Sequence, residues 1–165
     1  MPPVSDQPVA AIVYNPIKVH VEELRTEVAA AEERNGWAAS RWYETSEVDP
    51  GIGQAKQAVA DGATVVLAAG GDGTIRAVAE GLRHADVPIA LLPAGTGNLL
   101  ARNLNLSLAR MHDSVEVAFT GVDRHIDLGV AELERPDGSR DTHAFVVLAG
   151  LGLDARMIAL SLIHI

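Results

Sequence analysis

Residues 64–79 read TVVLAAGGDGTIRAVA: an apolar strand, then glycines at positions 70, 71 and 73, then the start of a helix. Glycine has no Cβ, so the backbone can turn with positive φ and its N–H groups can approach an anion closely. The positive end of the following helix dipole favours negative charge at the same place. The segment therefore predicts a phosphate-binding turn directly after a buried strand.

Asp72 stands between two glycines of this turn. A carboxylate repels phosphate unless a divalent cation or a proton-transfer task accompanies it. We therefore expect Asp72 to face a magnesium nucleotide or a transferring hydroxyl. The alternative is that Asp72 is the N-cap of the helix that follows.

The spacing excludes two familiar phosphate-binding turns. No Lys-Ser or Lys-Thr pair follows the glycines, which excludes a P-loop, and Arg76 stands where a dinucleotide-binding turn has its third glycine. The turn also follows the third predicted strand, whereas the dinucleotide turn follows the first. A different α/β nucleotide-binding arrangement is therefore required.

Composition limits the class of protein. With 165 residues, 48% of them hydrophobic, the chain can bury a core of domain size. A net charge of −9 without a cluster of Lys and Arg argues against nucleic-acid binding. The absence of cysteine excludes disulfides and thiolate metal sites, and fits a reducing compartment.

The sequence shows neither a signal peptide nor a membrane-spanning segment. Residues 1–8 lack the basic and apolar regions of a signal peptide, and the longest apolar run, 144–153, falls short of the about 18 residues that a membrane span needs. We expect a cytoplasmic protein without a transmembrane segment, which would meet any membrane substrate from outside the bilayer.

Strands and helices alternate over the first three quarters of the chain. The strands are short apolar runs, as in a parallel sheet that is buried on both faces. The helices show apolar residues at helical spacing, with stop signals such as Asn35-Gly36. We expect a three-layer α/β domain with strands at 9–14, 38–43, 64–69 and 87–92, and helices at 18–35, 49–60, 72–82, 99–104 and 107–120.

A second glycine-rich turn, Pro93-Ala94-Gly95-Thr96-Gly97-Asn98, follows the fourth predicted strand. Asn15-Pro16 ends the first strand in the same way. Ligands of open α/β sheets bind outside the carboxyl ends of the strands, so these turns are expected to form one ligand site.

The pattern changes after Gly121. Segments 123–133 and 142–148 are predicted strands, and the turn signal at 135–139 between them indicates a β-hairpin. We therefore divide the chain into an α/β domain, 1–121, and the truncated beginning of a β-rich domain, 122–165. The second part is too short for a domain of its own, so we expect the chain to be incomplete.

The two glycine turns and Asn15-Pro16 together resemble the diacylglycerol kinase catalytic-domain family, which includes bacterial lipid kinases and sphingosine kinases. The resemblance extends from residue 9 to about residue 157 of this sequence. NAD kinases share the first turn, and the Pro-x-Gly-Thr-x-Asn turn distinguishes the diacylglycerol kinase family from them. Segments 126–129 and 150–155 also resemble later elements of the family, including the first strand of its β-sandwich domain.

The resemblance implies ATP-dependent, magnesium-dependent phosphorylation of a lipid hydroxyl, with the lipid met at the membrane surface and bound in a cleft between the two domains. It implies a catalytic role for Asp72, and a general base and magnesium ligands beyond residue 165. The residues that it places around the nucleotide are Asn15, Pro16, Lys18, Thr45, Gly70, Gly71, Asp72, Gly73, Thr74, Ile75, Arg76, Gly95, Thr96 and Asn98.

The sequence departs from the family pattern at several positions. Arg76-Ala77 replaces a common Asn-Glu, Leu99 replaces an Asp, and Ile17-Lys18-Val19 replaces a turn of small residues. Lys18 and Arg76 could supply charge to phosphates. We expect a lipid kinase fragment that holds a nucleotide but does not transfer phosphate alone. An NAD kinase-type enzyme and a non-catalytic nucleotide-binding module are the alternatives.

Overall fold

The computed structural model describes residues 7–106 and 110–147, and its centre is a parallel sheet of four strands. Their order is β2-β1-β3-β4, so the chain runs outward from β1 in one direction and returns to the other side of it with β3. This arrangement confirms the predicted α/β class. The strands are β1 (Val9–Tyr14), β2 (Ala38–Glu44), β3 (Val65–Gly70) and β4 (Ile89–Pro93).

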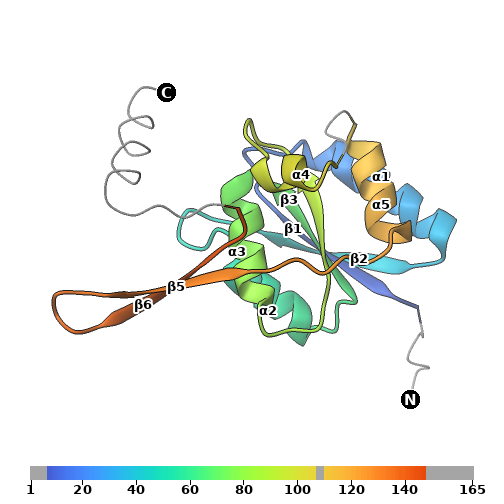
Figure 1. Ribbon diagram of the computed structural model, residues 1–165. Coiled ribbons are helices and arrows are strands. Elements are labelled where there is room, and N and C mark those ends of the chain that lie inside the picture. Colours follow the sequence, from blue (N-terminus) through green and yellow to red (C-terminus); the bar gives the residue numbers. More distant parts are fainter. Residues whose placement is uncertain (1–6, 107–109, 148–165) are drawn as a thin grey trace, which may run out of the picture.

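Helices cover both faces of this sheet, which gives three layers (Figure 1). One face packs against α1 (Val21–Asn35) and α5 (Met111–Thr120), and the other against α2 (Ile52–Ala60) and α3 (Asp72–Leu82). The short helix α4 (Leu99–Asn103) follows β4.

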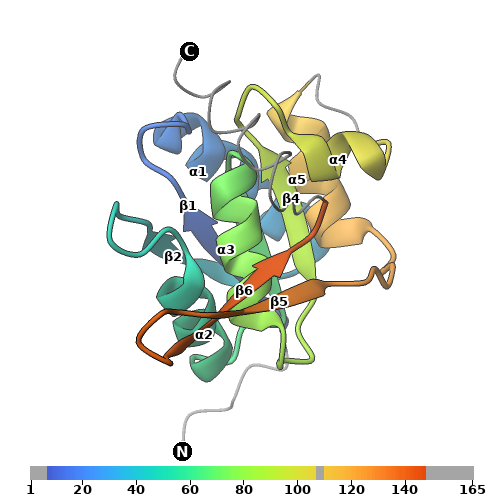
Figure 2. The same cartoon turned by 60° about the vertical axis from the view of Figure 1, so that its left-hand side comes forward.

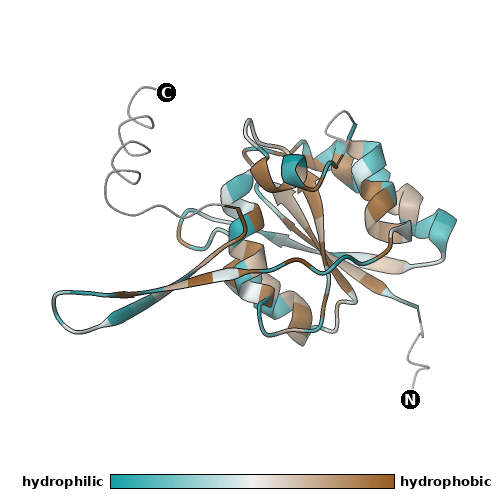
Figure 3. Ribbon diagram, viewed as in Figure 1, coloured by the Kyte–Doolittle hydropathy of each residue, from teal (hydrophilic) through white to brown (hydrophobic). Residues whose placement is uncertain are grey.

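The core consists of two apolar clusters separated by the sheet. Successive residues of a strand point to opposite faces, so Ile12 of β1 belongs to the cluster under α1 and α5, and Val13 to the one under α2 and α3. All of β3 is buried. This two-sided burial explains why β1 and β3 are continuous apolar runs, and Figure 3 shows the apolar colour concentrated in the sheet and on the inner sides of the helices.

A separate antiparallel hairpin follows α5. It consists of β5 (Gly129–Glu134) and β6 (Arg140–Phe145), and it projects from the α/β layers (Figure 1). Its β6 strand lies against α3, where Ala144 is only 2% exposed (Figure 2). The predicted hairpin is therefore confirmed.

Several predicted boundaries were wrong. The first helix begins at Val21 rather than at Lys18, because residues 15–19 form a turn in which Lys18 and Val19 donate to the Asn15 carbonyl. The strand predicted from residue 123 begins at Gly129. No partner strand lies opposite residues 123–128 in the described structure.

The second helix also begins later than predicted. Its N-cap is Gly51, and Ile52 is its first residue, rather than an Asp49 cap followed by Pro50. Asp49 still serves the helix terminus, because its carboxylate accepts hydrogen bonds from the amides of Gly51, at 3.1 Å, and Gly53, at 3.0 Å. The helix α5 begins at Met111, with Arg110 as its N-cap, rather than at residue 107, and β6 runs from Arg140 to Phe145 rather than over 142–148. Residues 107–109 and the predicted segment 150–155 lie outside the described residues.

Candidate functional site: two glycine turns at the carboxyl edge of the sheet

The carboxyl ends of the four parallel strands lie at one edge of the sheet, and backbone hydrogen bonds join them there. The amide of Thr45, after β2, donates to Tyr14 O, and the amide of Asn15, after β1, donates to Ala69 O, each at 2.9 Å. The amide of Ala94, after β4, donates to Gly70 O at 2.8 Å. The strand order reverses between β1 and β3, which is where open α/β sheets bind ligands.

The first glycine turn presents the N-terminus of α3 to open space. A Cβ on Gly70 would lie 2.7 Å from the Thr74 hydroxyl, so this position requires glycine for the close packing of strand and helix. A Cβ on the exposed Gly73 would meet no atom within 4 Å. The first amides of an α-helix have no intrahelical acceptor and carry partial positive charge. The space over Gly73 therefore suits an anion.

Not every residue of this turn faces that space. Thr74 and Ile75 are 5% and 1% exposed, and Ile75 belongs to the core cluster under α2 and α3. Their contribution to an anion site at this helix terminus is therefore limited to backbone amides.

The second glycine turn is held by Asn98. This residue has the left-handed backbone conformation, with φ 50°, and it is 6% exposed. Its Oδ1 accepts from the Gly95 amide at 3.0 Å, and its Nδ2 donates to Gly95 O at 2.7 Å. Asn98 thus fixes the shape of the turn, and Thr96 is exposed on it.

The two glycine turns contact each other directly. A Cβ on Gly95 would lie 2.8 Å from the Gly71 Cα, so the backbones approach as closely as glycine allows. Asp72 Oδ1 accepts the Leu99 amide at 2.7 Å. The alternative that Asp72 is the N-cap of its own helix is wrong, because the N-cap is Gly71, and the Asp72 side chain binds the N-terminus of α4 instead.

The turn after β1 adds a third component to this edge. The side-chain oxygen of Asn15 accepts from the amides of Ile17, at 3.0 Å, and Lys18, at 3.3 Å. Asn15 therefore shapes the turn, and Pro16, Ile17 and Lys18 are exposed on it. On the other side of β1, Thr45 is 5% exposed.

Arg76 is engaged with an acid that the sequence analysis did not consider. Its guanidinium pairs with Glu80 Oε2 at 3.0 Å, one helical turn further along α3. The same oxygen accepts the Ala144 amide of β6 at 3.4 Å. The i,i+4 spacing of Arg76 and Glu80 was the available signal for the pair, but nothing in the sequence indicated the contact with the hairpin.

The described residues contain no group of three or more His, Cys, Asp or Glu placed to hold a metal ion. Magnesium therefore finds no carboxylate set in this part of the chain. Over the same residues, no helix is both long enough and apolar enough to cross a bilayer.

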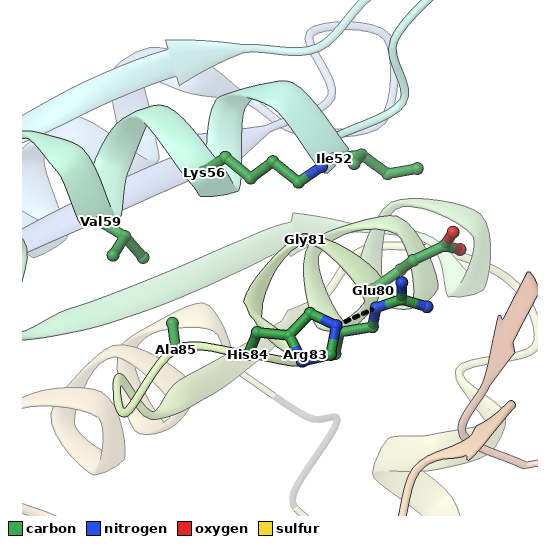
Figure 4. Close-up of a pocket in the computed structure, with 8 residues that line it drawn as sticks. All are labelled: Ile52, Lys56, Val59, Glu80, Gly81, Arg83, His84 and Ala85. Atoms are coloured by element: carbon green, nitrogen blue, oxygen red, sulfur yellow. Dashed lines mark hydrogen bonds between the residues drawn. The ribbon is translucent and has the colours of Figure 1, made fainter. Parts of the chain in front are cut away.

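A hollow of about 290 Å³ lies between α2 and α3, apart from the glycine turns (Figure 4). Lys56 extends from α2 on one side, and Arg83 and His84 follow α3 on the other, with the Arg83 Nε donating to His84 Nε2 at 2.9 Å. No residue of either glycine turn lines it. We place the candidate site at the turns rather than in this hollow, because two glycine turns meet there beside the open space over Gly73 at the N-terminus of α3.

Comparison with known proteins agrees with this geometry. A model of the diacylglycerol kinase catalytic domain matches residues 10–131. A diacylglycerol kinase of Bacillus subtilis is 32% identical over 128 residues, which cover 73% of this chain and 41% of that protein. One from Mycobacterium tuberculosis is 36% identical over 72 residues, covering 44% of this chain and 23% of that protein.

The fold of the chain is also found among solved structures. The crystal structure of a diacylglycerol kinase from Bacillus anthracis superposes with a TM-score of 0.57 at 15% identity, over 82% of this chain and 46% of that one. The present chain thus spans less than half the length of these relatives. On the match of the family model to most of its length, the chain belongs to the diacylglycerol kinase catalytic-domain family.

Proposed function

We propose that this chain provides the ATP-binding part of a lipid kinase that phosphorylates a hydroxyl group of a diacylglycerol-like lipid. The observation that carries the proposal is the meeting of the two glycine turns after β3 and β4, next to the point between β1 and β3 where the strand order reverses, with open space over Gly73 at the N-terminus of α3. The names of the relatives support the choice of a lipid as acceptor.

The nucleotide phosphates would lie over Gly73, where backbone amides of α3 can donate to their oxygens. Two exposed residues on neighbouring turns, Lys18 and Thr96, can contribute a cation and a hydroxyl from either side. Phosphoryl transfer depends mainly on positioning and on neutralising charge, and this set of donors serves both.

Asn15, Asn98 and Gly70 would act indirectly, since their contacts shape the turns that carry the donors. Arg76 would reach a phosphate only by leaving Glu80. We place the general base outside the described residues, because Asp72, the acid at the glycine turns within them, has an oxygen occupied by the Leu99 amide.

The fit for magnesium is different. No carboxylate cluster in the described residues is placed to bind it, so we assign no step to the ion here. We infer that the lipid is met at a membrane surface by a cytoplasmic protein, because a diacylglycerol-like acceptor resides in the membrane.

Isothermal titration of magnesium ATP into the chain tests the nucleotide site. We expect binding by the unmodified chain and its loss in Gly73→Val, because the added side chain fills the space assigned to phosphate. Ala60→Val is the control, since it adds a β-branched side chain to the exposed surface of α2 away from the turns. Equal binding by all three proteins would contradict the assigned phosphate position.

A transfer assay with labelled ATP tests the acceptor. We expect no transfer by the chain alone, and transfer to diacylglycerol when the C-terminal part of the Bacillus subtilis relative is joined to it. Transfer to NAD rather than to lipid would favour the NAD kinase alternative. ATP binding without transfer to either acceptor by the completed protein would favour a non-catalytic module.

A further inference from the structure

We propose that Asp72 is a positioning residue that fastens the two glycine turns into one unit. Its side-chain oxygens hold the β4–α4 turn against the β3–α3 turn, rather than bind a metal ion. The effect on nucleotide affinity rests on the function proposed above, whereas the effect on the turns themselves does not.

The first observation is the hydrogen bond across the turns. Asp72 is the first residue of α3, and its Oδ1 accepts the amide of Leu99, the first residue of α4, at 2.7 Å. An amide in the first turn of a helix has no intrahelical acceptor, so a side chain from elsewhere must supply one or leave it to water. A carboxylate acceptor makes this a charge-assisted bond, which is stronger than one between neutral groups.

The second observation concerns the other carboxylate oxygen. A Cβ on Gly97 would lie 2.6 Å from Asp72 Oδ2, so any other residue at position 97 would displace the carboxylate. Gly97 has no positive φ that would demand glycine for backbone reasons. The glycine at position 97 thus leaves room for the Asp72 carboxylate in the orientation that binds Leu99.

The third observation is that the turns also fit together beside Asp72. The amide of Ala94 donates to Gly70 O at 2.8 Å, and a Cβ on Gly95 would lie 2.8 Å from the Gly71 Cα. Three successive contacts therefore join the turns, two through the backbone and one through a side chain. The contact of Asp72 with Leu99 is the last of the three along the chain, and Asp72 is followed by the exposed Gly73.

This arrangement gives a physical reason for a carboxylate beside a phosphate site. The partial positive charge of the α4 amides offsets its negative charge, and the fixed orientation keeps Oδ1 on Leu99. A phosphate over Gly73 would then meet backbone amides held in place by two turns instead of one. Holding donors in place before the ligand arrives reduces the entropy that binding must cost.

The test compares two substitutions. Asp72→Asn keeps a side-chain oxygen that can accept the Leu99 amide but removes the charge, whereas Asp72→Ala removes both. Hydrogen exchange of the Leu99 amide, measured by NMR without nucleotide, reports directly on the hydrogen bond between Asp72 and Leu99. Titration with ATP, with and without magnesium, reports on its consequence. Asp137→Ala is the matched control, because Asp137 accepts the Ser139 amide at 2.9 Å in the distant hairpin turn.

We expect Asp72→Ala to raise the exchange rate at Leu99 about tenfold, as for the loss of one hydrogen bond to a charged group. Its affinity for ATP should fall by a similar factor. Asp72→Asn should stay within about threefold of the unmodified chain in both measurements and keep the same response to magnesium, because it retains the acceptor. The Asp137→Ala control should change neither.

Two results would overturn the proposal. One is unchanged exchange at Leu99 in Asp72→Ala. The other is a loss in Asp72→Asn as large as that in Asp72→Ala, with the magnesium response gone, which would make the charge act on a metal ion. If no protein in the series binds ATP, the proposed function fails, and the exchange data still decide whether Asp72 holds the two turns together. Should Asp72→Ala not fold, exchange and magnesium response in Asp72→Asn decide it.

Discussion

At position 73 the fold does not require glycine, whereas a bound phosphate would. Neither a positive φ nor a neighbouring atom requires glycine there, although it lies in the first turn of α3. Alanine is the better helix residue, by about 0.5 to 1 kcal/mol in a helix interior. The fold alone would therefore favour a larger side chain at position 73.

We predict opposite effects of Gly73→Ala on stability and on binding. The free energy of unfolding, from urea titration, should stay equal or rise by up to about 0.5 kcal/mol, because the methyl group enters open space and restricts the unfolded chain. The affinity for magnesium ATP should fall, since that space is assigned to phosphate.

Gly95→Ala provides the contrast. Its Cβ would meet the Gly71 backbone at 2.8 Å, so stability and binding should fall together. If Gly73→Ala bound ATP as well as the unmodified chain, the phosphate would have to lie elsewhere on this edge.

A second pair of residues, Tyr43 and Asp61, links strand β2 to the end of α2 and carries a pH dependence. Burial, and then the hydrogen bond to Asp61 at 2.6 Å, raise the pKa of Tyr43 to about 12. The same bond is the main reason that the pKa of Asp61 lies below its ordinary value of 3.8, with Gln57 contributing a second bond. A neutral hydroxyl thus donates to an ionised carboxylate over the physiological range.

Tyr43→Phe should therefore raise the pKa of Asp61 toward 3.8, which a carboxyl carbon NMR titration measures. A lowered folded-state pKa contributes stability above pH 3.8 that is lost as the pH falls through the folded-state value. The stability difference between the two proteins should thus shrink on acidification below pH 4. Tyr14→Phe is the control, because Tyr14 pairs with Glu44, and an unchanged Asp61 titration in Tyr43→Phe would contradict the assignment.

At the scale of elements, α3 connects the candidate site to the hairpin. Its N-terminus forms the first glycine turn, and Glu80, two turns along the helix, accepts from both Arg76 and the Ala144 amide of β6. The ion pair is partly exposed and should contribute only about 0.3 to 0.5 kcal/mol. The loss of an acceptor for a buried amide costs more, about 1 to 3 kcal/mol.

We predict that Glu80→Ala loosens the hairpin more than the helix. Hydrogen exchange followed by mass spectrometry should show faster exchange in residues 140–145, with little change in α3. Glu80→Gln keeps an oxygen for Ala144 and should protect β6 nearly as well as glutamate. Glu132→Ala is the control, since it removes only an exposed pair with Arg140 within the hairpin. Equal exchange of β6 in Glu80→Ala and the unmodified chain would mean that apolar contacts alone hold it.

The elements that the sequence predicted well are those with local causes. The first strand matches residue for residue, because a parallel strand that is buried on both faces needs a continuous apolar run. The second, which lies at the edge of the sheet and contains Ser40 and Arg41, differs by one residue. Helix starts were less accurate. Asp49 was the expected N-cap, but the N-cap is Gly51, and the Asp49 carboxylate accepts from the amides of Gly51 and Gly53. The sequence does not distinguish these two ways of binding the helix terminus.

The sequence predicted where the candidate site lies in the fold, but not the contacts that hold its two turns together. The strand–glycine–helix pattern located both turns, because the backbone rules there are local. The bond between Asp72 and Leu99 joins residues 27 positions apart, and the role of Asn98 within its own turn depends on a left-handed conformation. Such contacts follow from the packing of two turns and have no signature at either residue alone.

For the whole molecule, the two core clusters bear on the predicted boundary near residue 121. Their buried members all lie between Ala10 and Phe119, and of the described residues after α5 only Val146, directly after β6, is packed against either cluster. Ala144 is buried on α3 outside both clusters. The expected boundary near residue 121 therefore divides the chain where few apolar contacts cross, and it remains a prediction.

We predict that residues 1–121 fold without the hairpin. The loss of the contacts of Ala144 and Val146 should lower the free energy of unfolding by about 2 kcal/mol or less, on the small apolar area involved. Near-UV circular dichroism reports on this directly, because Trp37 packs on Phe119 and Trp42 on Tyr14. A chain ending at residue 106 is the contrast, because it lacks α5 with the buried Val115 and Phe119, and it should lose that signal. If 1–121 also lost near-UV structure while keeping its helices, the hairpin would belong to the same cooperative unit, because α3 would need β6 to fix its packing.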